Sequence, residues 1–249
     1  MSGHSKWATT KHKKAIIDAK RAKNFTKLLK EITVAAKLGD PNPDFNPRLR
    51  TAVIAAKAAS VPKDNIANAI KKGAGLTGSG NDWEELKYEG YGPGGIALII
   101  EVLTDNRNRS ASNVRSALTK FSGNLGESGS VSFMFDKVGV IGFEGKVASE
   151  EEMLEEVINA GGDNVESSSE YHEITTSVEN FIKVRDVLML KFGEPEEASI
   201  RWMAKDPVII IDVEKARTIE KLIEKLEDDE DVQNVYSNHE IDKSIEEQL

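Results

Sequence analysis

Residues 149–162, SEEEMLEEVINAGG, contain the start, the body and the end of one helix. Ser149 and Glu152 have the spacing of a capping box, in which the serine hydroxyl and the glutamate carboxylate each accept a hydrogen bond from an amide at the helix start. The two glycines at the end of the stretch are a stop signal, because glycine readily adopts the left-handed conformation that closes a helix. The stretch therefore predicts a helix over 150–160.

The segments on both sides of this helix predict a complete small domain. Short apolar or alternating runs indicate strands, and a second pattern with 3.6-residue spacing indicates another helix. In chain order the predicted elements are a strand at 138–143, the helix at 150–160, strands near 164–168 and at 171–176, a helix at 178–192 and a strand at 197–204. The order βαββαβ is that of the ferredoxin-like split βαβ motif. Residues 137–204 are therefore expected to form a ferredoxin-like α+β domain.

The same order recurs when the segments before and after this domain are joined. These segments are a strand at 96–103, a helix at 107–121, a strand at 130–135, a strand at 208–211, a helix at 213–226 and a strand at 232–237. We therefore predict that the domain at 137–204 is inserted into a second ferredoxin-like domain, made of residues 76–136 plus 205–240. An acidic C-terminal tail, residues 241–249, follows it.

The N-terminal residues predict an all-helical domain instead. Apolar residues at 3.6-residue spacing indicate a helix over 15–38. An Asn-Pro pair at 46–47 provides an N-cap with proline at the first helical position, and Pro62 begins a third helix. Glycine, serine and threonine at 73–80 predict a flexible linker. Residues 1–75 are thus expected to form a three-helix domain, which makes the whole chain an α+β protein.

Charge is divided unevenly along the chain. The net charge of the 249 residues is −9. Residues 1–75 contain 13 Lys and 3 Arg against 4 Asp and 1 Glu, a net charge of +11, whereas the remainder has 17 basic and 37 acidic residues, a net charge of −20. Such asymmetry is typical of a chain with one segment that binds a polyanion.

The basic segment supplies the candidate nucleic-acid-binding residues. Lysines neutralise phosphates and release counterions, and an exposed indole can stack on a splayed base. For Trp7 the favoured interpretation is packing on the helical domain, because large aromatic side chains are usually buried, with stacking as the alternative. The candidates are Lys6, Trp7, Lys11, His12, Lys13, Lys14, Lys20, Arg21, Lys23, Lys27, Lys30, Arg48 and Arg50.

A second polar run, Thr104-Asp-Asn-Arg-Asn-Arg-Ser110, stands at a predicted strand-to-helix junction. One of its first three residues is expected to cap the helix. Arg107 and Arg109 then fall in the first helical turn, where a positive charge opposes the helix dipole. Compensation by a bound phosphate and compensation by the protein's own carboxylates are both open, so the two arginines are candidate secondary phosphate contacts.

A glycine motif raises the question of a nucleotide-binding enzyme. Residues 90–95, GYGPGG, match G-x-G-x-x-G, but a predicted strand follows them, whereas a dinucleotide loop opens a helix. Pro93 also removes one of the amides that a phosphate cradle would use. The stretch is therefore interpreted as chain geometry and not as a cofactor site.

Other catalytic signatures are absent from the sequence. It has four histidines in no metalloprotease pattern, no cysteine, and no nucleophile elbow. The acidic run at 227–231 lacks the glycine and spacing of an EF-hand and is interpreted as a solvated turn. We therefore expect no catalytic residues, no metal, no cofactor and no small-molecule substrate. No apolar run approaches the roughly 18 residues of a membrane span, and no secretory signal is present, which predicts a cytoplasmic protein without membrane partners.

Eight short motifs, taken together, resemble the YebC family. They are SGHSKW at 2–7, DAKRAK at 18–23, FTKL at 25–28, NPRLR at 46–50, PKDNI at 62–66, EGYGPGG at 89–95, TDNRNR at 104–109 and GSV at 129–131. The resemblance implies a helical N-terminal domain, two α+β domains around a cleft, and control of gene expression by nucleic-acid binding. Bacterial members are commonly assigned as cytoplasmic DNA-binding transcriptional regulators. Relatives include a mitochondrial translational activator of cytochrome c oxidase, and a ribosome-associated role has been proposed.

The sequence is therefore compatible with three functions. A DNA-binding transcriptional regulator is the one that the resemblance favours. A translation factor that binds ribosomal RNA is second, favoured by the lack of a recognisable helix-turn-helix. A metal-dependent enzyme that uses an acidic cleft is a distant third.

Overall fold

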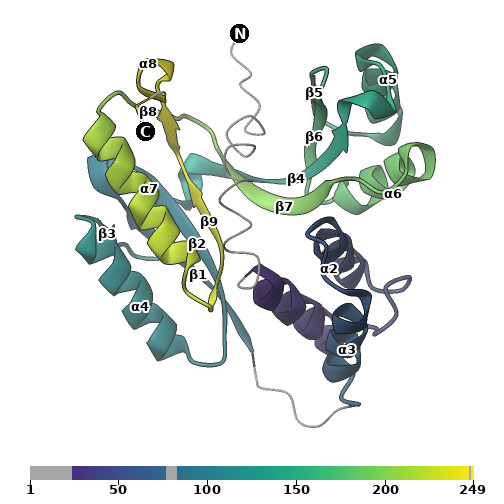
Figure 1. Ribbon diagram of the computed structural model, residues 1–249, viewed down its shortest axis with the longest axis horizontal. Coiled ribbons are helices and arrows are strands. Elements are labelled where there is room, and N and C mark those ends of the chain that lie inside the picture. Colours follow the sequence, from purple (N-terminus) through teal and green to yellow (C-terminus); the bar gives the residue numbers. More distant parts are fainter. Residues whose placement is uncertain (1–23, 77–82, 247) are drawn as a thin grey trace. The chain divides into compact units, whose positions relative to one another are not determined.

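The computed structural model describes residues 24–76, 83–246 and 248–249. The chain divides into two compact units (Figure 1). The first unit is Met1–Gly80 with Lys137–Arg201, and the second is Asn81–Asp136 with Trp202–Leu249. The helical residues thus share a unit with the segment that the sequence treats as a separate inserted domain, and the predicted three-domain boundaries stay a prediction.

The N-terminal part of the first unit is helical, as predicted. Residues 24–38 form a helix, followed by α2 (Pro47–Ala58) and α3 (Lys63–Gly73). Ile32 of the first of these helices is fully buried, together with Leu49 and Ala56 of α2, in one apolar core. The predicted start of the first helix and most of the predicted linker lie outside the described residues.

Asn46 connects the first two of these helices. Its Oδ1 atom accepts a hydrogen bond from the amide of Leu49 at 3.0 Å, so that it caps α2 as predicted. Its Nδ2 atom donates to the carbonyl of Ala35 and to that of Asp40, both at 2.8 Å. A Cβ atom on residue 39 would lie 2.6 Å from this Nδ2 atom, so glycine at position 39 makes room for the amide.

Asn46→Ala is expected to lower the free energy of unfolding by about 2 kcal/mol, because it removes the cap and leaves the buried carbonyl of Ala35 without its donor. Urea denaturation measures this loss. Asn65→Ala, at an exposed position of α3, is the matched control and should change stability by less than about 0.5 kcal/mol. Equal stability of the two variants would contradict the assigned role of Asn46.

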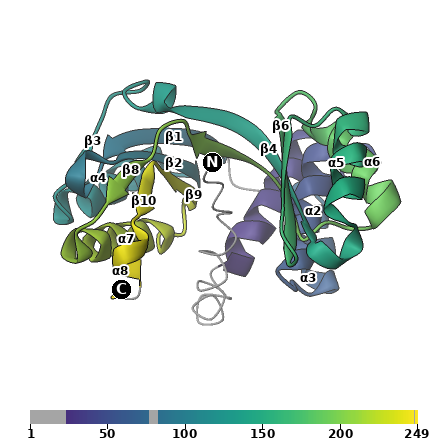
Figure 2. The ribbon, with the colours of Figure 1, turned by 90° about the horizontal axis from the view of Figure 1, so that it is seen from above.

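The rest of the first unit has the predicted split βαβ topology. Its elements are β4 (Phe135–Glu144), α5 (Glu150–Ala160), β5 (Asn164–Ser167), β6 (Tyr171–Ser177), α6 (Phe181–Phe192) and β7 (Glu197–Ala204). The sheet order is β5-β6-β4-β7, with β6 antiparallel to both of its neighbours. Both helices cover one face of the sheet (Figure 2). Ser149 caps α5, and Gly161 ends it with a φ of 91°, as predicted.

The second unit contains a four-stranded antiparallel sheet of order β3-β1-β2-β9. Its elements are β1 (Glu84–Tyr91), β2 (Ala97–Thr104), α4 (Arg107–Lys120), β3 (Asn124–Leu125), α7 (Val213–Glu227) and β9 (Val232–Ser237). Alternate residues of β2, among them Leu98 and Ile100, are buried against α4 and α7. A parallel pair, β8 (Val208–Ile210) with β10 (His239–Ile241), and the short α8 (Lys243–Glu246) complete the unit.

Several expectations for this unit were wrong in detail. The strand β1 was missed, and β8 pairs with β10 in a sheet of its own. Residues 130–135 do not form a strand, because a short 3-10 helix spans Ser132–Met134 and a strand begins only at Phe135. The segment 241–249, expected to be a tail, includes α8, whose Ile245 is buried in the apolar core.

The glycine motif at 90–95 ends the strand β1 with its first two residues and forms the turn of a β-hairpin with the other four. It joins β1 to β2, and the amide of Gly92 donates to the carbonyl of Ile96 at 2.8 Å. Gly94 and Gly95 have φ values of 78° and 77°, a region that side chains with a Cβ rarely adopt. The strand that was predicted to follow the motif is present as β2, which supports its interpretation as chain geometry.

Candidate nucleic-acid interface

The structure describes six of the predicted contact residues. Lys27 and Lys30 lie on the helix over 24–38, Arg48 and Arg50 lie on α2, and Arg107 and Arg109 lie on α4. The others lie outside the described residues: Lys6, Trp7, Lys11, His12, Lys13, Lys14, Lys20, Arg21 and Lys23.

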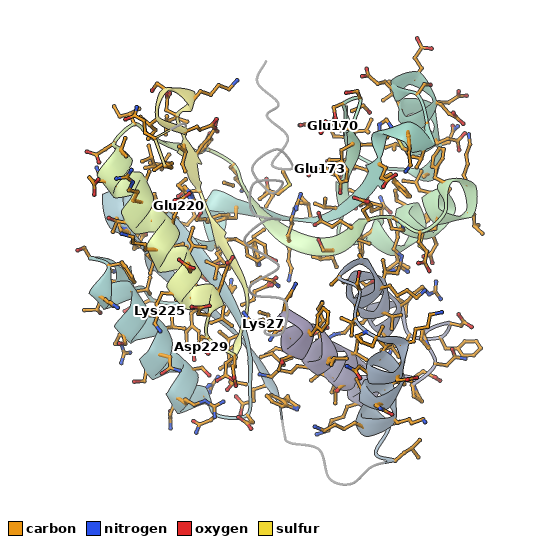
Figure 3. All side chains as sticks on the ribbon, viewed as in Figure 1. Lys27, Glu170, Glu173, Glu220, Lys225 and Asp229 are labelled. Atoms are coloured by element: carbon orange, nitrogen blue, oxygen red, sulfur yellow. The ribbon has the colours of Figure 1, made fainter. Side chains whose placement is uncertain are left out.

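The two lysines of the first helix lie on the side opposite Ile32 and Ala36. Lys27 and Lys30 are partly exposed, whereas Ile32 and Ala36 of the same helix are buried in the core (Figure 3 labels Lys27). Helix spacing places Val34 on the same side as these two lysines, and Val34 is only 2% exposed, so the described turns lack the clean division into a basic and an apolar face that the sequence predicts.

Arg48 binds a carboxylate of its own domain. Its Nε atom lies 2.7 Å from Oε1 of Glu31, and its Nη2 atom lies 3.1 Å from Oε2. This is the bidentate geometry in which a guanidinium binds a carboxylate most strongly. Arg48 thus links α2 to the preceding helix.

Arg50 belongs to a polar contact between α2 and α6. Its Nη1 atom donates to Oδ2 of Asp186 at 2.8 Å, while the other oxygen of Asp186 accepts from Arg185 at 2.7 Å. Arg185 is fully buried and also donates to the hydroxyl of Thr51 at 2.6 Å. A carboxylate between two guanidiniums compensates the burial of Arg185, so these residues hold α2 against α6.

Three lysines of α3 differ from these arginines, because they are exposed and have no acidic partner among the described residues. Within the described ranges, no carboxylate lies within 4.0 Å of the ammonium of Lys63, Lys71 or Lys72. The sequence analysis did not name them among the candidate residues. The signal was present in the Lys-Lys-Gly end of the predicted helix, but lysine at a helix C-terminus is also favoured by the helix dipole.

The run at 104–110 is organised by one buried carboxylate, Asp231. Arg109 donates to both of its oxygens, at 2.9 Å and 3.0 Å. The hydroxyls of Thr104 and Ser110 donate to Oδ2 at 3.0 Å and 2.8 Å. Asn106 caps α4, which accords with the predicted capping. We name this set the Asp231 network.

Both arginines of this run therefore have acidic neighbours within the protein. Arg109 is bound by Asp231 and by Asp105 at 2.9 Å, and Arg107 lies 3.7 Å from Glu84. The sequence left open whether a bound phosphate or the protein's own carboxylates compensate the positive charges of these arginines. In the structure, the protein's own carboxylates do so. A role in contacting phosphate stays a prediction for both.

The acidic run at 227–231 is not simply a solvated turn. Asp231 is only 4% exposed, and Asp229, which follows α7 (Figure 3), accepts a hydrogen bond from the side chain of Asn113 at 2.7 Å. The expectation was wrong because it treated the run as local, whereas its partners come from α4 and from Thr104 at the end of β2. No group of three or more potential metal ligands occurs in the part of the chain that the structure describes.

A second buried carboxylate, Glu89 of β1, fixes the loop that precedes β4. It accepts hydrogen bonds from the amides of Gly129, Val131 and Ser132 at 2.8–2.9 Å. The hydroxyl of Ser132 donates at 2.5 Å, and the ammonium of Lys87 lies 3.0 Å away. Burial raises the pKa of Glu89, but these donors outweigh it and lower that pKa to about 2. We name this arrangement the Glu89 clamp.

The Glu89 clamp also explains why residues 130–135 are not a strand. Their alternating apolar side chains predicted one, but amides that bind a carboxylate cannot bind a neighbouring strand.

No helix among the described residues is long and apolar enough to cross a membrane.

Comparisons with known proteins cover most of the chain. A family model described as the TACO1/YebC protein N-terminal domain matches residues 5–76. A second, described as the TACO1/YebC second and third domain, matches residues 83–239. The crystal structure of a conserved hypothetical protein, Aq1575 from Aquifex aeolicus, is similar at 47% sequence identity and a TM-score of 0.81. That similarity covers 92% of this chain and 94% of the other.

Proposed function

The chain belongs to the TACO1/YebC family, and from this premise we propose that it is a non-enzymatic regulator of gene expression that binds nucleic acid through the phosphate backbone. Membership of this family supports a role in the regulation of transcription or translation. We further propose that the basic N-terminal residues bind the nucleic acid, and that they do so by contacting its phosphates.

The observation that carries the proposal is the surplus of lysine in the helical part of the first unit. Residues 24–76 contain 7 Lys and 2 Arg against 3 Asp and 1 Glu. Both arginines form ion pairs, whereas Lys63, Lys71 and Lys72 are exposed without a described carboxylate beside them. Unpaired lysines on a surface contact phosphates as point charges and release counterions.

The same observation favours structured RNA of the ribosome over a specific duplex DNA site. Sequence in the major groove is read best by planar side chains, above all by arginine bidentate to guanine. Arg48, Arg50 and Arg109 instead bind carboxylates of the protein. Lysine contacts to phosphate carry no sequence information, which suits a target recognised by shape. A DNA-binding transcriptional regulator is the alternative.

Neutralising Lys71 and Lys72 tests the proposal. For Lys71→Gln with Lys72→Gln, we expect about 20-fold weaker association with ribosomes at physiological salt, and a log K against log salt slope flatter by about 1.4–1.8. Binding is measured by sedimentation over a salt series. The matched control is Lys221→Gln with Lys225→Gln on α7 (Figure 3 labels Lys225), which makes the same change in charge on the second unit.

Equal losses for the two double variants would contradict binding through α3 and indicate a response to net charge alone. Two further measurements separate the targets. Deletion of Ser2–Lys14 should reduce co-sedimentation, and preference among DNA duplexes should be weak. A preference of about 10³-fold for one duplex without co-sedimentation would establish the transcriptional alternative.

A further inference from the structure

The loop over residues 126–134 is held rigidly and yet presents an aromatic ring to solvent. The Glu89 clamp holds its amides, and Tyr91 donates its hydroxyl to the carbonyl of Ser130 at 3.0 Å. Val131 is buried in a core below the loop. Phe133 is 65% exposed.

A single exposed phenylalanine is ordinary on a protein surface, but its rigid support is not. Burying a carboxylate is unfavourable unless hydrogen bonds compensate it, and here those hydrogen bonds converge on the loop that carries Phe133. A side chain on a loop that is already ordered loses little conformational freedom on binding. The clamp therefore prepares Phe133 for contact with a partner.

The neighbours of the loop indicate what kind of partner fits. The ammonium of Lys87 lies 2.6 Å from the hydroxyl of Ser132 and 4.9 Å from the centre of the Trp202 ring. The backbone amide of Lys205 donates to the carbonyl of Met134 at 3.0 Å, which brings a second lysine to the same loop. Its ammonium lies 3.3 Å from the exposed carboxylate of Asp136 and is itself 45% exposed, so this surface ion pair can open to a phosphate.

Trp202 packs against the core below the loop and donates its Nε1–H group to Glu101, so Phe133 is the ring that is exposed beside these lysines. An exposed ring next to lysines is a combination with which proteins bind unpaired bases and their phosphates.

We propose that Phe133 stacks on an unpaired base of the nucleic acid, and that Glu89 is its positioning residue. This inference rests on the proposed function and narrows its ligand class to nucleic acid with at least one splayed base. It also places a contact in the second unit, whereas the lysines of α3 belong to the first.

The probe is a short single-stranded RNA that carries 2-aminopurine, whose fluorescence is quenched when it stacks on a ring. With full-length protein, we expect Phe133→Ala and Phe133→Leu to weaken binding about tenfold and to remove the quenching. Phe133→Trp should retain both. Phe45→Ala is the matched control, because Phe45 is an equally isolated aromatic ring, 75% exposed, in a loop of the first unit.

The role of Glu89 is read from a double-mutant cycle. Glu89→Gln should weaken binding of the same RNA when Phe133 is present, and should have no further effect in the Phe133→Ala background. A purely structural role of Glu89 would lower affinity in both backgrounds.

The outcomes separate this inference from the proposed function. If the parent protein binds the RNA and Phe133→Ala binds equally well with equal quenching, the inference is overturned and the proposed function stands. If the parent protein binds no nucleic acid at all, both are overturned. If Phe133→Ala abolishes capture of a ribosomal protein but not RNA binding, the surface recognises protein and the inference is wrong.

Discussion

Asp231→Ala is expected to lower the free energy of unfolding by about 3 kcal/mol, the lower end of the range for breaking a buried ion pair. The carboxylate of Asp231 is 5% exposed and receives five hydrogen bonds from the side chains of Thr104, Arg109 and Ser110. Its removal leaves the buried hydroxyl of Thr104 without its acceptor, whereas that of Ser110 still reaches the carbonyl of Asn106 at 3.2 Å. Because Arg109 is 47% exposed, water can solvate part of the guanidinium, which limits the loss.

Urea or guanidinium denaturation measures this change. Asp206→Ala, which removes an exposed carboxylate of the same unit, is the control and should change stability by less than about 0.5 kcal/mol. The double variant Asp231→Ala with Arg109→Ala should lose less than the sum of the two single variants, because the two side chains interact directly. Additive losses would show that the Asp231 network does not act as a unit.

Glu89 is expected to make stability depend on acidity. Its pKa is lowered from 4.5 to about 2 in the folded protein, so the native state favours the ionised form. The resulting stabilisation is fully present above pH 4.5 and is lost as the pH falls towards 2. A shift of this size corresponds to about 3 kcal/mol. Acid should therefore lower the free energy of unfolding by protonating the carboxylate of Glu89, even though this side chain is buried.

Comparison with Glu89→Gln isolates this contribution from that of other carboxylates. The difference in unfolding free energy between the parent protein and this variant should be about 3 kcal/mol near neutral pH and should shrink as the pH falls to 2. Glu127→Gln, an exposed position of the same loop, should follow the parent protein at every pH. A constant difference across the pH range would contradict the assigned cause.

Local signals were enough to predict much of the fold. The helix α5 begins and ends where its capping serine and its glycine stand, because both act through backbone groups a few residues away. The same holds for Asn46 and α2. The strand β1 was missed because its sequence, EELKYEGY, is rich in charged residues that are depleted in strands. Pairing with β2 along the whole of its length overrides that preference.

Only the basic character of the candidate site could be predicted, because amino-acid composition alone determines it. The basic character of the N-terminal residues is visible in the sequence, whereas the partners of individual charges are not. Arg50 meets Asp186 across 136 positions, and Arg109 meets Asp231 across 122. No spacing rule connects residues so far apart, so only the folded chain distinguishes paired arginines from unpaired lysines.

The strand order of the second unit has a consequence for the protein's own synthesis. β2, buried almost throughout, ends at Thr104, while its partner β9 begins only at Val232. A ribosome that adds about 5–20 residues per second needs on the order of 10 s to bridge that interval. During this time the nascent chain carries an apolar strand with one unpaired edge, the kind of segment on which aggregation starts. Slow elongation should therefore lower the yield of native protein more than it would for a chain whose neighbouring strands emerge in succession.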